Sequence, residues 1–311
     1  MAQSAVTSAE APPGRDGWAG VKWRELRSAG SFDRGTRLQL SEGFQLKLPD
    51  DLSSVMEKAW EQARAVPGFL AELEFRALGL LAVCAPNDGV IVEIGSFKGK
   101  STLALASVAQ RYGLGQVVSI DPHTAPAITD PSLEGKASSF DDFLTTMRSA
   151  NLENQVEVHR AFSGDVAAGW DRKIRMLWID GDHTYGGTKQ DFDLFSPFLT
   201  EGATIALHDT LGRDYDGPIR VFVEDILRSD DFGPAGFSRS MGWAQYRPHD
   251  GRAFRELRER LARQAGRLIS FVIPGRRMEG FTKFHYKLLV SRIPHSKLPA
   301  TDSFSLSRAP S

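Results

Sequence analysis

The sequence lacks several features that define common classes of protein. It contains a single cysteine, Cys84, in 311 residues, which excludes an intramolecular disulfide and any zinc site built from several thiolates. Cys84 lies in the apolar run LGLLAVCAP, so we expect a small buried side chain. No stretch reaches the roughly 18 apolar residues that a membrane-spanning helix needs. The first residues, MAQSAVTSAEAPPGRDGW, have neither a basic start nor an apolar segment. We therefore expect a cytoplasmic protein with a disordered N-terminal leader.

A large excess of charge of one sign is also absent. The net charge is -1, and the hydrophobic and charged fractions of 41% and 25% are typical of globular proteins. This balance provides no drive toward nucleic acid. Residues 251–298, however, contain twelve Lys and Arg against three Asp and Glu. A basic amphipathic helix in this part could contact an anionic membrane surface, although a solvated face is the commoner explanation of such a charge run.

Two familiar nucleotide-binding loops are missing. The stretch VEIGSFKGKST, residues 92–102, resembles the phosphate-binding loop of nucleotide triphosphatases, but only three residues separate Gly95 from Gly99 where that loop needs four. The dinucleotide pattern G-x-G-x-x-G is absent as well, which disfavours hydride transfer. The segment IRMLWID still matches the strand ending in Asp that holds magnesium in triphosphatases. A P-loop-like phosphotransferase therefore remains an alternative.

Short apolar runs that alternate with helical patterns between residues 90 and 209 predict the fold. Runs this continuous are typical of parallel strands buried on both faces, and the segments between them are long enough for helices over 101–112, 139–150 and 188–199. The runs are VIVEIG, VVSIDP, VEVHRAF, IRMLWIDGD and ATIALHD. We predict an α/β fold with a doubly wound, Rossmann-like, mostly parallel seven-stranded sheet and helices on both faces. In such sheets ligands bind beyond the carboxyl ends of the strands.

The flanking segments complete this prediction. Two helices precede the sheet, over 54–66 and 71–83, and one more follows the fifth strand over 218–229. Residues 236–248 could supply a final antiparallel pair. We divide the chain into an N-terminal leader over 1–49, a sheet domain over 50–248, and a basic C-terminal extension over 249–311. The extension combines an amphipathic pattern over 252–275 with a strand-like pattern over 284–293.

Two acidic residues beside the glycines indicate what the 92–102 loop binds. Asp121 ends the second strand, where an acid can accept hydrogen bonds from both ribose hydroxyls of an adenosine-type ligand. A carboxylate at Glu93 would repel a pyrophosphate held at the helix N-terminus and suits a ligand with a positive centre or an amine. S-adenosylmethionine has both. Lys98 and Lys100 flank the start of the helix, and we expect them to point to solvent.

Polar residues also gather at the tips of the fourth and fifth strands. Asp180 ends the fourth strand, His183 follows three residues later, and His208 and Asp209 end the fifth. Neighbouring parallel strands lie about 4.8 Å apart, so side chains from both tips can converge on one ion. Tyr185 and His123 are expected at the edge of the site, and Asp182 is expected either behind the residues that line it or facing solvent. Trp178 inside the fourth strand is expected in the core.

Four of these motifs in order resemble a known family. VEIGSFKGKST, SIDPH, LWIDGDHTYGGTKQDF and GATIALHDT are similar to the class I S-adenosylmethionine-dependent methyltransferases. The resemblance is nearest to the branch of macrocin-type sugar O-methyltransferases and, more distantly, to catechol O-methyltransferase, and it covers about residues 70 to 210. It implies an O-methyltransferase that uses S-adenosyl-L-methionine and acts on a hydroxyl of a small molecule, with a sugar or vicinal diol favoured.

The resemblance also implies roles for individual residues. Those implied to contact the cofactor are Glu93, Gly95 and Ser96 at its methionine end, Asp121 at the ribose, and Phe162 and Ser163 near the adenine.

Metal-dependent members of the family imply a second set. Asp180, His208 and Asp209 would bind a divalent metal, Mg or Mn, and His183 would act as the catalytic base. His208 stands where a carboxylate is usual, and imidazole suits manganese, iron or zinc better than magnesium. A metal-free methyltransferase that uses His183 alone and a non-catalytic protein that binds an adenosyl ligand remain alternatives.

Overall fold

A computed structural model of the protein describes residues 48–86, 88–124, 138–274, 276, 278–299 and 304. The expected disordered leader and most of the loop after the second strand lie outside these residues. Among the helices described, none is both long enough and apolar enough to cross a membrane.

The described part of the chain contains the predicted seven-stranded sheet, with strand order β3-β2-β1-β4-β5-β7-β6. The first five strands are parallel, and β7 pairs antiparallel with both β5 and β6. The strands are β1 (Val90–Ile94), β2 (Val117–Ile120), β3 (Val156–His159), β4 (Ile174–Ile179), β5 (Leu199–Leu207), β6 (Phe232–Ser238) and β7 (Met241–Tyr246). The order reverses between β2-β1 and β4, which is where doubly wound sheets bind their ligands.

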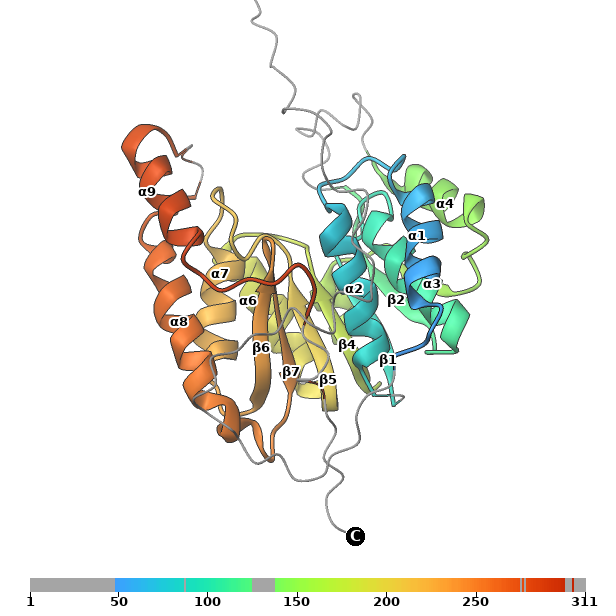
Figure 1. The fold of residues 1–311 in the computed structure, drawn as a ribbon. Helices are drawn as coiled ribbons and strands as arrows, with labels where there is room; N and C mark the ends of the chain where they lie inside the picture. The colour runs from blue at the N-terminus through green and yellow to red at the C-terminus, as the bar shows by residue number, and fades with distance from the viewer. Residues whose placement is uncertain are drawn as a thin grey trace, which may run out of the picture. The chain divides into compact units, whose positions relative to one another are not determined.

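Helices cover both faces of the sheet, as predicted (Figure 1). Those before β5 are α1 (Leu52–Ala63), α2 (Glu72–Cys84), α3 (Lys100–Tyr112), α4 (Phe140–Ser149), α5 (Ser163–Ala167), α6 (Tyr185–Phe195) and the 3-10 turn η4 (Ser196–Phe198). Those after β5 are α7 (Gly217–Val221), the π-helical turn η5 (Phe222–Leu227), the 3-10 turn η6 (Gly251–Phe254), α8 (Arg255–Ile269) and α9 (Gly280–Val290).

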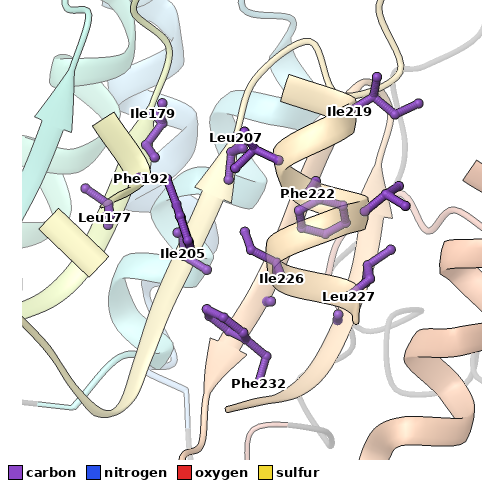
Figure 2. Close-up of a cluster of buried hydrophobic side chains, with 14 of the residues drawn as sticks. Leu177, Ile179, Phe192, Ile205, Leu207, Ile219, Phe222, Ile226, Leu227 and Phe232 are labelled. Atoms are coloured by element: carbon purple, nitrogen blue, oxygen red, sulfur yellow. The ribbon is translucent and has the colours of Figure 1, made fainter. Parts of the chain in front are cut away.

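The alternation of side chains along each strand divides the core into two layers. Leu177 and Ile179 of β4 belong to a hydrophobic cluster that also contains Phe192 of α6 and Phe222 of η5. Figure 2 shows these side chains together with Ile205, Leu207, Ile219, Ile226, Leu227 and Phe232. Trp178 points to the other face of the sheet and is fully buried, as expected, and Cys84 is buried too.

The strand-like pattern over 284–293 gave a wrong prediction, because this segment is mostly helix α9. Phe284, Tyr286, Leu288 and Val290 alternate as in a strand, but buried Tyr286 and Ile293 together with half-buried Val290 repeat at helical spacing and join the core. Tertiary packing of this inner face against the body of the domain therefore outweighs the two-residue alternation.

The basic amphipathic segment forms helix α8, whose apolar face is buried rather than presented to an external surface. Leu261, Ala262, Ala265 and Leu268 all belong to the same hydrophobic cluster as η5 and β6. Residues of the C-terminal extension thus complete the layer over one face of the sheet.

Candidate active site

The turn after β1 brings three parts of the sheet edge together. Gly95 has a φ of +88°, and a Cβ atom there would lie 2.2 Å from the carbonyl oxygen of Asp180. The same contact is fixed by a hydrogen bond of 2.8 Å from the Asp180 amide to the carbonyl of Ile94. Only glycine fits this conformation and this close approach of two backbones.

Asp121 at the end of β2 closes the turn from the other side. Its Oδ2 accepts hydrogen bonds of 2.8 Å from the backbone amides of both Ser96 and Phe97, and its Oδ1 accepts one of 2.6 Å from the amide of His123. Each carboxylate oxygen has two lone pairs, so Oδ2 is filled and Oδ1 keeps acceptor capacity for one further donor. The carboxylate therefore shapes the glycine turn and stays able to bind a hydroxyl group.

Glu93 lies beneath the turn and not on its surface. The residue is fully buried, and its two oxygens accept hydrogen bonds of 2.5 Å from the hydroxyls of Ser101 and Thr102 in the first turn of α3. Burial raises the pKa of Glu93 to about 7, although the hydroxyl donors oppose this shift. Glu93 thus links β1 to α3, and any influence on a ligand passes through its charge and through the position of the turn.

The expectation for the two lysines of the loop was wrong. Lys98 is buried, with its Nζ 3.1 Å from Oδ2 of Asp142 on α4. Lys100 is half-buried, and its Nζ donates a hydrogen bond of 3.3 Å to the carbonyl of Gly68. Both ammonium groups hold neighbouring elements in place, because α1, α2 and α4 pack close to the start of α3.

The two residues expected near an adenine lie at the start of α5. Phe162 precedes the helix and is 60% exposed, which excludes a role in core packing. Ser163 is hydrogen-bonded to Asp191 of α6, a buried carboxyl whose pKa is raised by burial to about 6. Phe162 therefore presents an apolar surface outside β3, on an element anchored to α6.

His123, expected at the edge of the site, is buried behind the second strand end. Its Nδ1 lies 2.9 Å from Oγ of Ser139, and its ring packs against Phe140 and Phe143 with centroid separations of 5.2 Å. Burial lowers the pKa of the imidazole below its usual value. Its contacts are those of a packed residue that supports the segment after Asp121.

The tips of β4 and β5 bring the four predicted polar residues together. Oδ1 of Asp180 lies 3.2 Å from Nε2 of His183 and 3.1 Å from Nδ1 of His208. Oδ2 of Asp209 lies 3.6 Å from Nδ1 of His208 and 3.8 Å from Nε2 of His183. Two carboxylates and two imidazoles thus converge on a small volume at the carboxyl edge of the sheet.

The electrostatics of this cluster follow from burial opposed by opposite charges. Burial alone would raise the pKa of Asp180, but the two imidazoles outweigh it and lower that pKa to about 2. Burial would lower the pKa of each histidine, yet Asp180 raises the pKa of His183 and raises that of His208 well above its usual value. Burial raises the pKa of Asp209. In the absence of a bound metal cation, protonated His183 and His208 therefore balance the negative charge of the carboxylates.

The donor atoms also fit a divalent cation. One ligand atom each from Asp180, His183 and His208 lie within 4.8 Å of one another. Ligands about 2.1 Å from an ion are separated by at most about 4.2 Å, so modest rotations would bring these three into a coordination shell. The grouping differs from the expected one, because it includes His183 and leaves Asp209 at the edge.

Glu74 of α2 is a residue of this site that the sequence did not reveal. It is 3% exposed, and its Oε2 lies 3.8 Å from Nε2 of His208. Oε2 also accepts a hydrogen bond of 3.0 Å from the Ala71 amide, and Oε1 accepts bonds from the amide and hydroxyl of Ser240 in the β6-β7 turn. The N-terminal helix and the antiparallel hairpin thus meet at His208.

The turn after β5 connects the cluster to helix α9. The Gly212 amide donates a hydrogen bond of 2.7 Å to the carbonyl of Asp209, and the Tyr286 hydroxyl donates to the carbonyls of Leu211 and Gly212. An opening of about 320 Å³ lies between this turn and α9, lined in part by Leu211, Arg213 and Lys287. A largely open depression therefore adjoins the turn after β5.

Residues 92–210 match a protein family described as a methyltransferase domain. The matched region begins inside β1 and ends just beyond Asp209, so it contains the glycine turn, Asp121 and the cluster at β4 and β5. This match places a methyltransferase domain in the part of the chain that carries the four motifs, in agreement with the class predicted from them.

Several solved structures are similar to this chain. A putative O-methyltransferase from Klebsiella pneumoniae has 15% identity and a TM-score of 0.46, and the match covers 65% of this chain and 92% of that chain. An O-methyltransferase from Bacillus cereus in complex with SAH has 19% identity and a TM-score of 0.46, with coverage of 65% and 94%. The O-methyltransferase TomG from Streptomyces achromogenes has 18% identity and a TM-score of 0.45, with coverage of 65% and 92%.

Proposed function

We propose that this methyltransferase transfers the methyl group of S-adenosylmethionine to a hydroxyl group of a small molecule, with a sugar or vicinal diol as the favoured acceptor. The observation that carries the proposal is the convergence of Asp180, His183, His208 and Asp209 beside the glycine turn, where Asp180 belongs to both. A methyl donor at the turn and a proton acceptor at the cluster would then be neighbours.

The proposed cofactor site follows the carboxyl ends of β1 to β3. Gly95 and Ser96 would lie against the methionine end and Asp121 would accept hydrogen bonds from the ribose, while exposed Phe162 and neighbouring Ser163 would flank the adenine. Glu93 would act on the cofactor from beneath the glycine turn. Its buried carboxylate, which accepts a hydrogen bond from the Ser101 hydroxyl, favours a positively charged ligand on the other side of the turn. A sulfonium cofactor is positive, whereas a triphosphate is not.

The proposed acceptor site follows the carboxyl ends of β4 and β5. A hydroxyl is a poor nucleophile until it loses its proton, and His183 is positioned to take it, because Asp180 at 3.2 Å orients the ring and stabilises the imidazolium. The cofactor brings an activated methyl group, so the protein's main tasks are alignment and proton removal.

Asp180, His208 and Asp209 would hold a divalent metal in this proposal. When bound, such a cation lowers the pKa of an acceptor hydroxyl and orients it, and a vicinal diol could chelate it at two points. The imidazole of His208 among these ligands favours manganese, iron or zinc over magnesium. His183 lies close enough to serve as a further ligand.

Metal-free transfer is a second candidate, because the His183-Asp180 pair already has the geometry of a base and its orienting acid. A transfer assay with methyl-labelled S-adenosylmethionine and a panel of sugars and catechols separates the two. If transfer depends on a metal, a chelator abolishes turnover and added manganese restores it. If transfer is metal-free, the chelator has no effect on turnover.

The same assay tests the site itself. Asp180→Ala and His183→Ala should lower turnover by at least about 100-fold while leaving the affinity for S-adenosylhomocysteine within a few-fold. Asp182→Ala is the matched control, since Asp182 accepts hydrogen bonds from Thr184 at the start of α6. Full activity of Asp180→Ala would reject the proposed acceptor site.

A further inference from the structure

Helix α9 carries an apolar face that the described part of the chain leaves uncovered. Phe281 is 79% exposed, Phe284 is 64% exposed and Leu288 is 38% exposed. Their spacing of three and four residues places them on one side of the helix. Monomeric proteins seldom expose large apolar side chains side by side without a binding role.

The opposite face of α9 fixes the direction in which these side chains point. Tyr286 is buried and its hydroxyl bonds to the turn after β5, while Val290 packs against the hydrophobic cluster. At 100° per residue, Tyr286 lies about 160° around the helix from Phe284 and from Leu288, and about 140° from Phe281. The apolar side therefore points away from the domain. Figure 1 shows α9 as a helix at the margin of the sheet domain, beside α8.

Basic residues surround this apolar face. Residues 270–298 contain six Lys and Arg and one acid, Glu279. Lys287 on the helix and Arg276 and Arg292 beyond its ends are exposed, and Lys283 is half-buried. A further apolar side chain, Ile273, is 50% exposed in the segment between α8 and α9. The surface formed by Ile273, Phe281, Phe284 and Leu288, with these basic residues around it, is called the α9 face below.

We propose that the α9 face binds the surface of an anionic lipid bilayer. Helices that lie in a membrane interface combine aromatic and leucine side chains on one face with Lys and Arg beside them. Anionic headgroups attract such cations within a Debye length, and the phenyl rings then enter the boundary between headgroups and acyl chains. Short, firmly packed α9 would bind reversibly and would need no rearrangement of the core.

A second copy of the chain fits the α9 face less well. A twofold interface places the same patch on both partners, so Lys283, Lys287 and Arg276 would meet their own copies and repel one another. A stable interface also buries roughly 800 Å² per partner, whereas the α9 face offers four apolar side chains. Charge complementarity thus favours the lipid surface.

This surface differs from the one that the sequence suggested. The apolar side of basic helix α8 is buried in the core, so α8 presents only its charged side. The α9 face lies instead on the element that contacts the turn after Asp209, so membrane binding would hold the carboxyl edge of the sheet near the lipid surface.

Vesicle sedimentation with the full-length protein tests the inference. Vesicles of phosphatidylcholine alone and vesicles with about 30% phosphatidylserine are compared at the same total lipid. The protein should sediment with the anionic vesicles, and raising the salt concentration should weaken binding. Phe281→Ser/Phe284→Ser and Lys283→Glu/Lys287→Glu should each reduce the partition coefficient by at least about 10-fold, since each removes one of the two components of binding.

Matched controls lie on a distant part of the chain. Phe69 is 78% exposed between α1 and α2, so Phe69→Ser tests the loss of any exposed ring. Lys58→Glu/Arg64→Glu changes two exposed cations at α1 and tests net charge. All variants should keep the far-UV circular dichroism and the S-adenosylhomocysteine affinity of the parent.

The inference would be overturned by the absence of sedimentation with anionic vesicles at about 1 mM lipid, by equal binding to neutral vesicles, or by equal loss of binding in the controls at Phe69, Lys58 and Arg64. A concentration-dependent dimer that Phe281→Ser/Phe284→Ser abolishes would assign the α9 face to a second copy and would likewise reject it.

Discussion

Oε2 of Glu74 lies 3.8 Å from Nε2 of His208, and Oδ1 of Asp180 lies 3.1 Å from Nδ1 of the same ring. The imidazole thus lies between the buried carboxylate of Glu74, from an N-terminal helix, and the half-buried carboxylate of Asp180, at the tip of β4. At 3.8 Å the contact with Glu74 is an ion pair and not a hydrogen bond, so Glu74 acts on the ring by electrostatic attraction. Glu74 therefore positions His208 without facing the site itself.

Removing Glu74 should be costly, because it leaves a buried cation without one of its partners. Glu74→Ala should lower the free energy of unfolding by about 3 to 5 kcal/mol, and Glu74→Gln by less, since its single amide oxygen can still accept the hydrogen bonds from the amide and hydroxyl of Ser240. Urea unfolding of the cofactor-free protein measures both. Glu72→Ala, on the exposed side of α2 with a surface pair to Arg76, should cost less than about 1 kcal/mol. Equal effects at the two positions would contradict the positioning role.

The buried carboxyl of Glu93 predicts a pH dependence of stability. Its pKa is about 7 in the folded protein and about 4.3 in an unfolded chain. Between these two pH values Glu93 is protonated in the folded protein and ionised in the unfolded chain. The contribution of Glu93 to the free energy of unfolding therefore falls as the pH rises, and it is fully lost above about pH 7. The variant Glu93→Gln does not titrate.

The difference between the two proteins isolates this effect. Relative to the parent, Glu93→Gln should gain about 2 to 3 kcal/mol in free energy of unfolding between pH 5 and pH 8. Urea unfolding at both pH values, without cofactor, measures the change, and other titrating groups cancel. A difference that stays constant with pH would show that Glu93 is charged throughout.

The close approach of Gly95 to Asp180 predicts a large effect of one methyl group. A Cβ at residue 95 would lie 2.2 Å from a backbone oxygen that cannot rotate away, so Gly95→Ala should lower stability by about 3 kcal/mol or more and abolish cofactor binding. Gly113→Ala is the control, because Gly113 has a φ of +62° with no atom within 4 Å of an added Cβ, and should cost about 1 kcal/mol. Thermal unfolding with and without S-adenosylhomocysteine compares them. A mild Gly95→Ala phenotype would be inconsistent with this packing.

The sequence predicted the parts of the molecule that depend on short-range pattern. Continuous apolar runs identified β1 to β5, and their polar ends placed Asp180 beside His208 because neighbouring parallel strands end at one edge. The seven-stranded sheet and the helix pair before it were also predicted. These features follow from burial and periodicity, which a sequence carries directly.

Features that depend on which surfaces meet were missed or predicted wrongly. Glu74 precedes the sheet, and nothing in its neighbourhood shows that α2 carries it to His208. Lys98 has a sequence context typical of a solvent-facing residue, yet the approach of α4 provides Asp142 as a partner. The alternation of apolar residues over 284–293 suggested a strand, because Phe284 and Leu288 fit both the two-residue period of a strand and the spacing of a helix. In each case tertiary contacts decided the outcome.

Calorimetry of the purified protein with S-adenosylmethionine, S-adenosylhomocysteine and ATP tests the central claim, which is that the turn after β1 binds a sulfonium cofactor and not a triphosphate. The account predicts saturable binding of the first two with dissociation constants in the micromolar range and no binding of ATP. Asp121→Ala should weaken the affinity for the two adenosyl ligands at least about 10-fold, whereas Asp141→Ala, at an exposed position of α4, should leave it unchanged. Tight ATP binding, with no heat from the two adenosyl ligands at millimolar concentration, would contradict it.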